Sequence, residues 1–296
     1  MGYIDYCFNY FHCKKNLVSC LFTVCLAGCV SPTKQTDQLL SANHSFPRKF
    51  EILGVPFVAQ TEAHCGPATL TMAMQWAGKK INLEKVSPQV FTPGMKGSLQ
   101  ADMIGASRRN GLMAVPISGM NSLMTEIANN HPVVVFENLA VSWLPQWHYA
   151  IVFGYDLDKP HVLMHSGPEE NKQWDLRKFE RSWMLGDYWG LVILPPGQIA
   201  ISADELANMT AAAALEQAGF TKEAELSYLK IEQHWPNSLS ALIGLGNIAY
   251  TNNKFQEAVD FLKKAIKYHP ESLVAKKNLV IAENALKAKS PNIRRK

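Results

Sequence analysis

The sequence predicts an α+β domain followed by an all-helical module, behind an N-terminal targeting segment. Three observations support this prediction. Between residues 50 and 197, helices are expected first and a series of short apolar strands afterwards, an order typical of an antiparallel sheet covered by helices. After residue 197 the composition becomes alanine-rich and helical. The first 29 residues contain an apolar run that is too short to cross a membrane as a helix.

The composition is that of an ordinary globular protein. The 296 residues suggest about two domains on a prior of about 150 residues each. With 47% hydrophobic and 18% charged residues, the chain can bury a sizeable core. The net charge of +4 is small and lies partly in the terminal stretch Lys287–Lys296. We therefore expect no nucleic-acid partner, and we also expect no cofactor and no bound metal.

The N-terminal segment has the features of a signal peptide. Lys14 and Lys15 precede the apolar run Leu17–Ala27, whose eleven residues fit a signal h-region. The run ends in Leu-Ala-Gly-Cys, with the cysteine at position 29, and this ending resembles a bacterial lipobox. The alternative is an ordinary signal peptide that is cut nearby.

The lipobox resemblance implies that Cys29 becomes the new N-terminus and carries acyl chains, palmitate among them. Such chains would anchor the protein to a membrane of the bacterial cell envelope, on the periplasmic or cell-surface side. We accordingly expect a signal peptide over residues 1–28 and a polar, flexible tether over 29–49.

Cys65 is the only cysteine beyond residue 29, since the other five all lie in the targeting segment. The body of the protein therefore has no partner for a disulfide, and an unpaired thiol in an exported protein needs a reason. Cys65 is followed by Gly66 and Pro67 and then by a helical pattern over residues 68–77. Because proline is tolerated in a first helical turn, Cys65 is expected at or just before the helix N-terminus.

A helix N-terminus favours the thiolate form of cysteine, because unsatisfied N–H groups point at the sulfur. Gly66 would allow another part of the chain to approach closely. Gln60, five residues before Cys65, could place an amide donor where an oxyanion would form on an attacked carbonyl. The alternative is a small buried cysteine that caps a core helix.

Periodicity and turn residues place the other elements of the α+β domain. Helices are expected at 98–110, with Ser98 as N-cap and Gly111 just past the end, and at 121–129 and 175–183. Strands are expected at 54–59, 112–117, 132–136, 147–155, 161–165 and 188–194.

His148 opens an otherwise aliphatic strand, and it is the best candidate for a base that acts on Cys65. An imidazole can take the thiol proton, so a Cys–His pair suffices as a nucleophile. The alternative is a core histidine with a hydrogen-bond partner of its own. His64, His161 and His165 are weaker candidates, because of their positions beside Cys65 and on the following strand.

The segment Gln60…Cys65-Gly66-Pro67, followed by His148-Tyr149 at the start of a strand, resembles the C39-like branch of the papain-type cysteine peptidases. The resemblance covers about residues 52–196 and implies a papain-like fold and a thiol protease. It implies a nucleophile at Cys65, an oxyanion donor at Gln60 and a base at His148. Known members remove double-glycine leader peptides and are fused to a transporter. The sequence has no Walker A motif, so we do not expect that fused architecture.

The chain departs from the family at the third catalytic position. Members usually carry an orienting aspartate in an Asp-Pro pair after the strand that follows the histidine, and here Ser166-Gly167 stands there. If strands 147–155 and 161–165 pair as a hairpin, Ser166 lies beside His148, whereas Asp156 and Asp158 lie at the far end. We predict that Ser166, or a backbone carbonyl beside it, orients His148.

The C-terminal part repeats at 34 residues, so that Ala224 aligns with Ala258 and Pro236 with Pro270. This pattern resembles two tetratricopeptide repeats, at about 205–238 and 239–272, followed by a capping helix to about residue 287. The domain organisation expected is a peptidase domain over 50–197, a repeat module over 204–289 and a tail over 290–296. The repeats would bind a protein partner or dock onto the enzyme domain.

These features predict an exported, lipid-anchored cysteine peptidase that hydrolyses a peptide or amide bond of a peptide or protein substrate. Two alternatives stay open. The domain could be a peptidase-shaped binding module without activity, or the same Cys–His pair could serve an isopeptidase or an acyl-transfer enzyme.

Overall fold

The computed structural model describes residues 33–59 and 64–289. The chain divides into two units, residues 1–34 and 35–296, and the first lies almost wholly outside the described residues. The signal peptide, Cys29, Gln60 and the tail after residue 289 therefore also lie outside them. In the described part of the chain, no helix is both long and apolar enough to span a bilayer.

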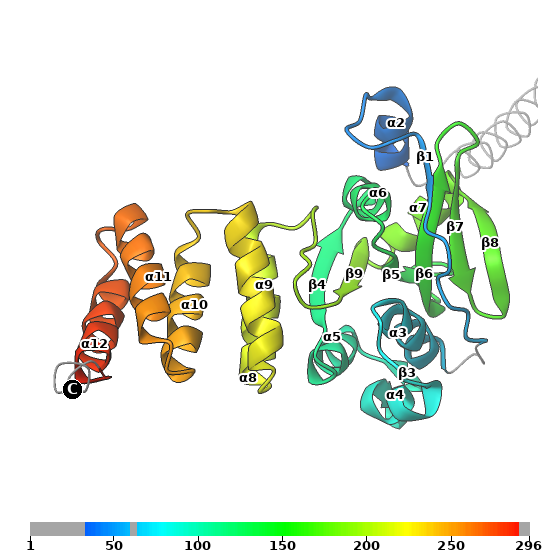
Figure 1. The fold of residues 1–296 in the computed structure, drawn as a ribbon. Coiled ribbons are helices and arrows are strands. Elements are labelled where there is room, and N and C mark those ends of the chain that lie inside the picture. Colours follow the sequence, from blue (N-terminus) through cyan, green and yellow to red (C-terminus); the bar gives the residue numbers. More distant parts are fainter. Residues whose placement is uncertain (1–32, 60–63, 290–296) are drawn as a thin grey trace, which may run out of the picture. The chain divides into compact units, whose positions relative to one another are not determined.

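The α+β prediction is confirmed by a seven-stranded antiparallel sheet in the order β4-β9-β5-β6-β7-β8, with β1 paired to the end of β6 (Figure 1). The strands are β1 (Lys49–Glu51), β4 (Met113–Ser118), β5 (Val133–Asn138), β6 (Trp147–Asp156), β7 (His161–Ser166), β8 (Glu169–Asp175) and β9 (Trp189–Leu194). A separate small ribbon joins β2 (Phe91–Thr92) to β3 (Gly97–Ser98).

Helices cover both faces of this sheet. The helices α3 (Cys65–Trp76), α4 (Leu83–Val90) and α5 (Gln100–Arg109) share a core with Val134, Tyr149 and Ile151 (Figure 1). The helices α6 (Met120–Ala128) and α7 (Leu176–Met184) pack with the alternate strand positions, among them Val133, Val135, Ala150 and Val152. The alternation follows from the two-residue period of a strand.

Most expected elements are present, and the differences have physical causes. The strand expected at 54–59 is wrong, since β1 ends at Glu51 and residues 52–59 form no helix or strand. Ser98 is not a helix cap, because it pairs with Phe91 in the small ribbon and Leu99 precedes α5. Several elements were not expected. Among them are α4, which holds Pro88, and β8, an edge strand whose charged sequence has no apolar run.

The flexible tether expected over 29–49 is wrong over part of its length, because α2 (Lys34–Ser41) is a helix. Its first turn binds the sheet domain through Glu180, which is fully buried and accepts the N–H groups of Gln35 and Thr36 at 3.1 and 2.7 Å. A buried carboxylate at a helix N-terminus satisfies donors that the helix itself leaves unpaired. Polar composition alone could not reveal this partner.

The C-terminal module consists of α8 (Glu205–Gln217), α9 (Thr221–His234), α10 (Leu239–Thr251), α11 (Phe255–Tyr268) and α12 (Leu273–Lys289) (Figure 1). The first two pairs repeat at 34 residues, since α8 and α10 begin at Glu205 and Leu239 and α9 and α11 at Thr221 and Phe255. The turn residues Gly219 and Asn253 both have positive φ, +86° and +58°. A helical repeat of this period is therefore present, and its assignment as tetratricopeptide stays a prediction.

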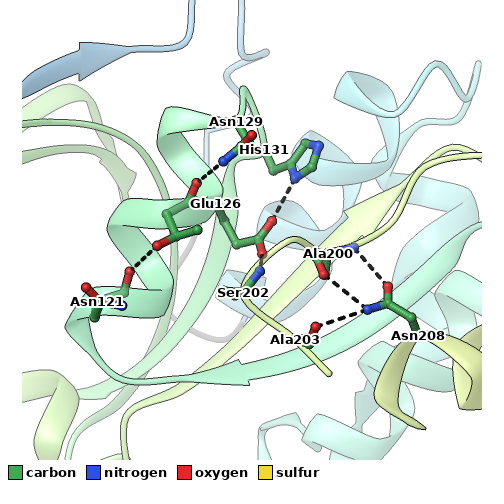
Figure 2. Close-up of polar contacts among 9 residues, drawn as sticks. Asn121, Glu126, Asn129, His131, Ala200, Ser202, Ala203 and Asn208 are labelled. Carbon is green, nitrogen blue, oxygen red and sulfur yellow. Dashed lines mark hydrogen bonds and ion pairs between the residues drawn. The ribbon is translucent and has the colours of Figure 1, made fainter. Parts of the chain in front are cut away.

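A buried carboxylate forms a hydrogen bond between the sheet domain and the segment that precedes the repeats. Glu126 of α6 accepts from the backbone N–H of Ser202 at 2.6 Å and lies 2.7 Å from Nδ1 of His131 (Figure 2). Nearby, the side chain of Asn208 bonds both the N–H and the carbonyl of Ala200. Because both oxygens of Glu126 have partners, its burial is compensated, and it fixes where the linker leaves the domain.

Candidate active site

Cys65 is the first residue of α3, as the sequence predicts, and His64 is the N-cap. Cys65 is 8% exposed. The backbone N–H groups of Tyr149, Gly66 and Cys65 itself act on the sulfur and lower the pKa of the thiol, but burial raises it more. The expected preference for thiolate is therefore wrong for this state, because desolvation of the charged form outweighs the helix-terminal donors. Cys65 rests as a neutral thiol.

Gly66 allows a close approach, although the approaching group is a side chain rather than backbone. A Cβ at this position would lie 2.4 Å from Oγ and 2.6 Å from Cβ of Ser98. The ribbon that carries Ser98 is held there by Tyr149, whose hydroxyl donates to the Ser98 carbonyl at 3.1 Å. Thr69 in turn donates to the carbonyl of Tyr149 at 3.2 Å. The start of α3 is thus fixed against the start of β6.

His148 is the second residue of β6 and its imidazole is largely buried. Its Nε2 lies 3.1 Å from Oγ of Ser166, the contact expected from the hairpin, because β6 and β7 pair with Ala150 opposite Ser166. When Nε2–H donates to the hydroxyl, Nδ1 is left without a proton and can act as an acceptor. Burial and the nearby Lys172 charge lower the pKa of His148 to about 4. The imidazole is therefore neutral at physiological pH.

Cys65, His148 and Ser166 line one open cleft of about 580 Å³. Apolar side chains of Leu139 and Trp147 form part of its lining, and Glu169 and Lys172 of β8 form another part. The structure thus brings together three of the four catalytic residues predicted from the sequence. The fourth, Gln60, lies outside the described residues. The catalytic role of each of the four stays a prediction.

The weaker candidates lie elsewhere or have other partners. His64 stacks on Phe91 with ring centroids 5.1 Å apart. His165 bonds the carbonyl of Val55 through Nε2 and accepts from the N–H of Asn171 at Nδ1. Asp156, at the far end of the hairpin, accepts from the N–H groups of Asp158 and Lys159. The place of Asp156 in the turn agrees with the expectation that it does not orient His148.

Sequence reasoning missed Glu137, which lies directly opposite His148 in the pairing of β5 with β6. The side chain is fully buried, and burial raises the pKa of its carboxyl to about 7, although Ser182 and Lys172 act in the opposite direction. The available signal was an acidic residue at the end of the apolar run Val133-Val134-Val135-Phe136. A charged side chain there is costly to bury and therefore needs an explanation.

Within the described ranges, no group of three or more histidine, cysteine, aspartate or glutamate side chains is arranged to hold a metal ion. The cleft is lined by both a thiol and an imidazole. Such a pair can attack a carbonyl carbon through sulfur while the imidazole accepts the proton.

Comparison with known proteins agrees with this geometry. Residues 52–190 match the model of a family described as "Peptidase_C39 like family". No curated protein matches the chain. Three solved structures align with about half of the chain. A C39-like peptidase from Bacillus anthracis is 16% identical, with a TM-score of 0.42 over 49% of this chain and 97% of its own.

The second is a double glycine motif protease from an AMS/PCAT transporter in complex with the leader peptide, 19% identical, with a TM-score of 0.37 over 49% of this chain and 93% of its own. The third is the peptidase domain of Streptococcus ComA, a bi-functional ABC transporter of a quorum-sensing pathway, 17% identical, with a TM-score of 0.40 over 48% and 99%. The family model is the finding that supports a C39-like peptidase domain, and its match covers residues 52–190, just under half of the chain.

Proposed function

We propose that this protein is a cysteine peptidase that hydrolyses a peptide or amide bond with Cys65 as nucleophile and His148 as base. The observation that carries the proposal is that a helix-terminal thiol and a strand-initial imidazole line one cleft, with Nε2 of the imidazole bonded to Ser166. The match of residues 52–190 to a peptidase family supports it.

The protonation states favour a general-base route over a preformed ion pair. Burial raises the pKa of Cys65, and burial with Lys172 lowers that of His148, so both groups are neutral before reaction. As the sulfur forms its bond to the substrate carbonyl carbon, the thiol proton moves to Nδ1 of His148. The backbone donors around Cys65 stabilise negative charge that develops nearby, and Gln60 is proposed to hold the oxyanion.

The second half of the reaction returns the proton. The imidazolium of His148 protonates the leaving nitrogen as the C–N bond breaks, which leaves a thioester on Cys65. A water molecule then attacks the thioester carbon and gives its proton to His148. Release of the carboxylic acid and return of the proton to sulfur restore the neutral pair.

The test is hydrolysis of a fluorogenic peptide library by the full chain and its variants. We expect Cys65→Ala to abolish cleavage and His148→Ala to reduce it by about 10³-fold. His161→Ala is the matched control, a histidine at the far end of the hairpin, and should leave the rate unchanged. Peptide binding without any product, equal in wild type and Cys65→Ala, would instead support a non-catalytic binding module. Product bearing an added amine would indicate acyl transfer.

We further propose that Cys29 carries a lipid anchor and that α8–α12 form a tetratricopeptide module for a protein partner. The support is the Leu-Ala-Gly-Cys ending of the apolar run and the 34-residue helical repeat. Cys29→Ala should move the protein from the membrane fraction to the soluble fraction of a bacterial expression host. A variant that stays in the membrane fraction would contradict the lipobox interpretation.

A further inference from the structure

The site contains a buried acid that the mechanism above does not use. Glu137 of β5 and His148 of β6 are directly opposite one another. Opposite residues in an antiparallel pair project from the same face of the sheet, with Cβ atoms about 5 Å apart. Their neighbours at alternate positions, Val135 on β5 and Ala150 on β6, indeed belong to one core cluster. Glu137 and His148 therefore project side by side from the same face of the sheet, and Glu137 is fully buried.

The carboxyl group of Glu137 has few hydrogen-bond donors around it, so its charged form is poorly stabilised. Oε2 lies 2.9 Å from Oγ of Ser182, which also lies 2.9 Å from the carbonyl of Phe179. A serine hydroxyl has one hydrogen, so it cannot donate to both acceptors. Oε1 has no hydrogen-bond partner in the described part of the chain. In the described part of the chain a carboxylate here would therefore have at most one donor for its two oxygens, which is unfavourable for a buried charge.

A carboxylate at this position would need a cation beside it. The charged group that acts on both Glu137 and His148 is Lys172 on β8. Lys172 is already paired with Glu169 at 2.7 Å and lies over the ring of Trp174. On α7, Ser182 carries no charge and Glu180 is bound to α2 and Tyr188. The imidazolium of His148 is the cation that arises during the reaction without a partner of opposite charge.

We propose that Glu137 is a positioning residue that acts through His148, supplying the negative charge that Ser166 cannot supply to the imidazolium. The inference rests on the proposed function for its catalytic meaning, although the pairing itself can be observed without any substrate. No bond to substrate forms or breaks at Glu137. The carboxylate stabilises the protonated imidazole by charge across the two strands, and Ser166 fixes the ring plane from the other side.

The pH range in which Glu137 carries a negative charge follows from the burial of its carboxyl group. The pKa of Glu137 is raised to about 7, so the carboxyl ionises in the neutral range. Below that pH the carboxyl is neutral, His148 has a low proton affinity and transfer from the thiol is disfavoured. Above it, the new negative charge raises the proton affinity of the imidazole. Activity should therefore rise as pH increases through about 7.

The pairing is tested by NMR in the Cys65→Ala chain, with the side-chain carboxyl of Glu137 and the ring nitrogens of His148 labelled. We expect the carboxyl signal to titrate near pH 7 and the nitrogen signals to respond in the same step. Glu137→Gln, which preserves size, should remove that step. Titration of the carboxyl in the ordinary glutamate range, or imidazole signals that ignore it, would overturn the proposal whether or not the protein cleaves peptides.

Kinetics test the catalytic consequence. Glu137→Gln should lower kcat about tenfold or more, leave KM nearly unchanged and abolish the rise in activity near pH 7. Ser182→Ala should instead shift that rise to higher pH, because its hydroxyl lowers the pKa of Glu137. Glu51→Gln, an exposed carboxyl on β1, is the control and should change neither. If the NMR step is present but the wild-type chain cleaves no peptide, the peptidase proposal fails and the Glu137–His148 pair stands.

Discussion

The hydroxyl of Ser166 lies 3.1 Å from Nε2 of His148 but carries no charge. We predict that Ser166→Asp raises turnover, because an aspartate in this place both orients the ring and stabilises its protonated form. Ser166→Ala should lower turnover, since the ring loses the acceptor at Nε2. Asp156→Asn should leave turnover nearly unchanged, because Asp156 is bound in the turn at the far end of the hairpin. A large loss from Asp156→Asn with none from Ser166→Ala would contradict this assignment.

Glu137 should also leave a signature in stability. Its pKa rises from an ordinary value of 4.5 to about 7 on folding, so between these values the folded chain binds more protons than the unfolded chain. The free energy of unfolding therefore falls as pH increases through this window, by about 3 kcal/mol from this group. His148, whose pKa falls to about 4, has the opposite slope between 4 and its ordinary value of 6.5.

Because the two slopes oppose one another, wild-type stability alone does not isolate Glu137. We predict that the difference in unfolding free energy between wild type and Glu137→Gln falls by about 3 kcal/mol from pH 4.5 to pH 7.5, measured by urea denaturation. A difference that does not vary with pH would show that the carboxyl ionises normally in the folded protein.

At the scale of elements, the start of α3 and the β2–β3 ribbon depend on one another through Gly66 and Ser98. We predict that Gly66→Ala destabilises the protein by about 1–3 kcal/mol, because its Cβ would overlap the Ser98 side chain. Adding Ser98→Gly should recover most of the loss. Ser98→Ala should not, since a Cβ remains 2.6 Å from the new methyl group. Chemical denaturation of the wild type, of Gly66→Ala and of the two double variants measures this coupling. Equal losses with and without Ser98→Gly would refute it.

The loop between β5 and β6 shapes the cleft on its apolar side. Asn138 holds it, since Oδ1 accepts from the N–H groups of Ala140 and Gln146 at 3.0 and 2.9 Å. The loop therefore has a fixed shape while it exposes Trp143, 81% accessible, and Leu144, 64% accessible. Leu139 of this loop lines the cleft itself, and an apolar side chain there is suited to the apolar part of a ligand.

On the scale of the whole molecule, Glu126 connects the sheet domain to the segment that begins the helical repeats (Figure 2). We predict that Glu126→Ala destabilises the protein by about 3 kcal/mol, because the N–H of Ser202 and Nδ1 of His131 lose a buried charged partner. Thermal and urea unfolding measure the loss, and Glu51→Ala on exposed β1 is the control. A loss no larger than that of the control would show that the linker is held by apolar contacts alone.

The sequence by itself determined the features that local rules govern. The helix that begins at Cys65, the β6–β7 hairpin and the 34-residue helical period follow from proline and glycine placement, strand alternation and repeat spacing. The hydrogen bond from His148 to Ser166 was also predictable, because hairpin register places the end of one strand beside the start of the other.

Only the tertiary structure decided the features that depend on burial and on contacts far apart in the chain. The neutral state of Cys65 comes from desolvation, which exceeds the effect of the helix terminus that the sequence shows. The helix α2 is held in place by Glu180, which lies 145 residues after Gln35 in the chain. Glu137 lies opposite His148 because β5 pairs with β6. A sequence pattern shows which groups are present, whereas the proton affinity of a group depends on the solvent and charges that the folded chain places around it.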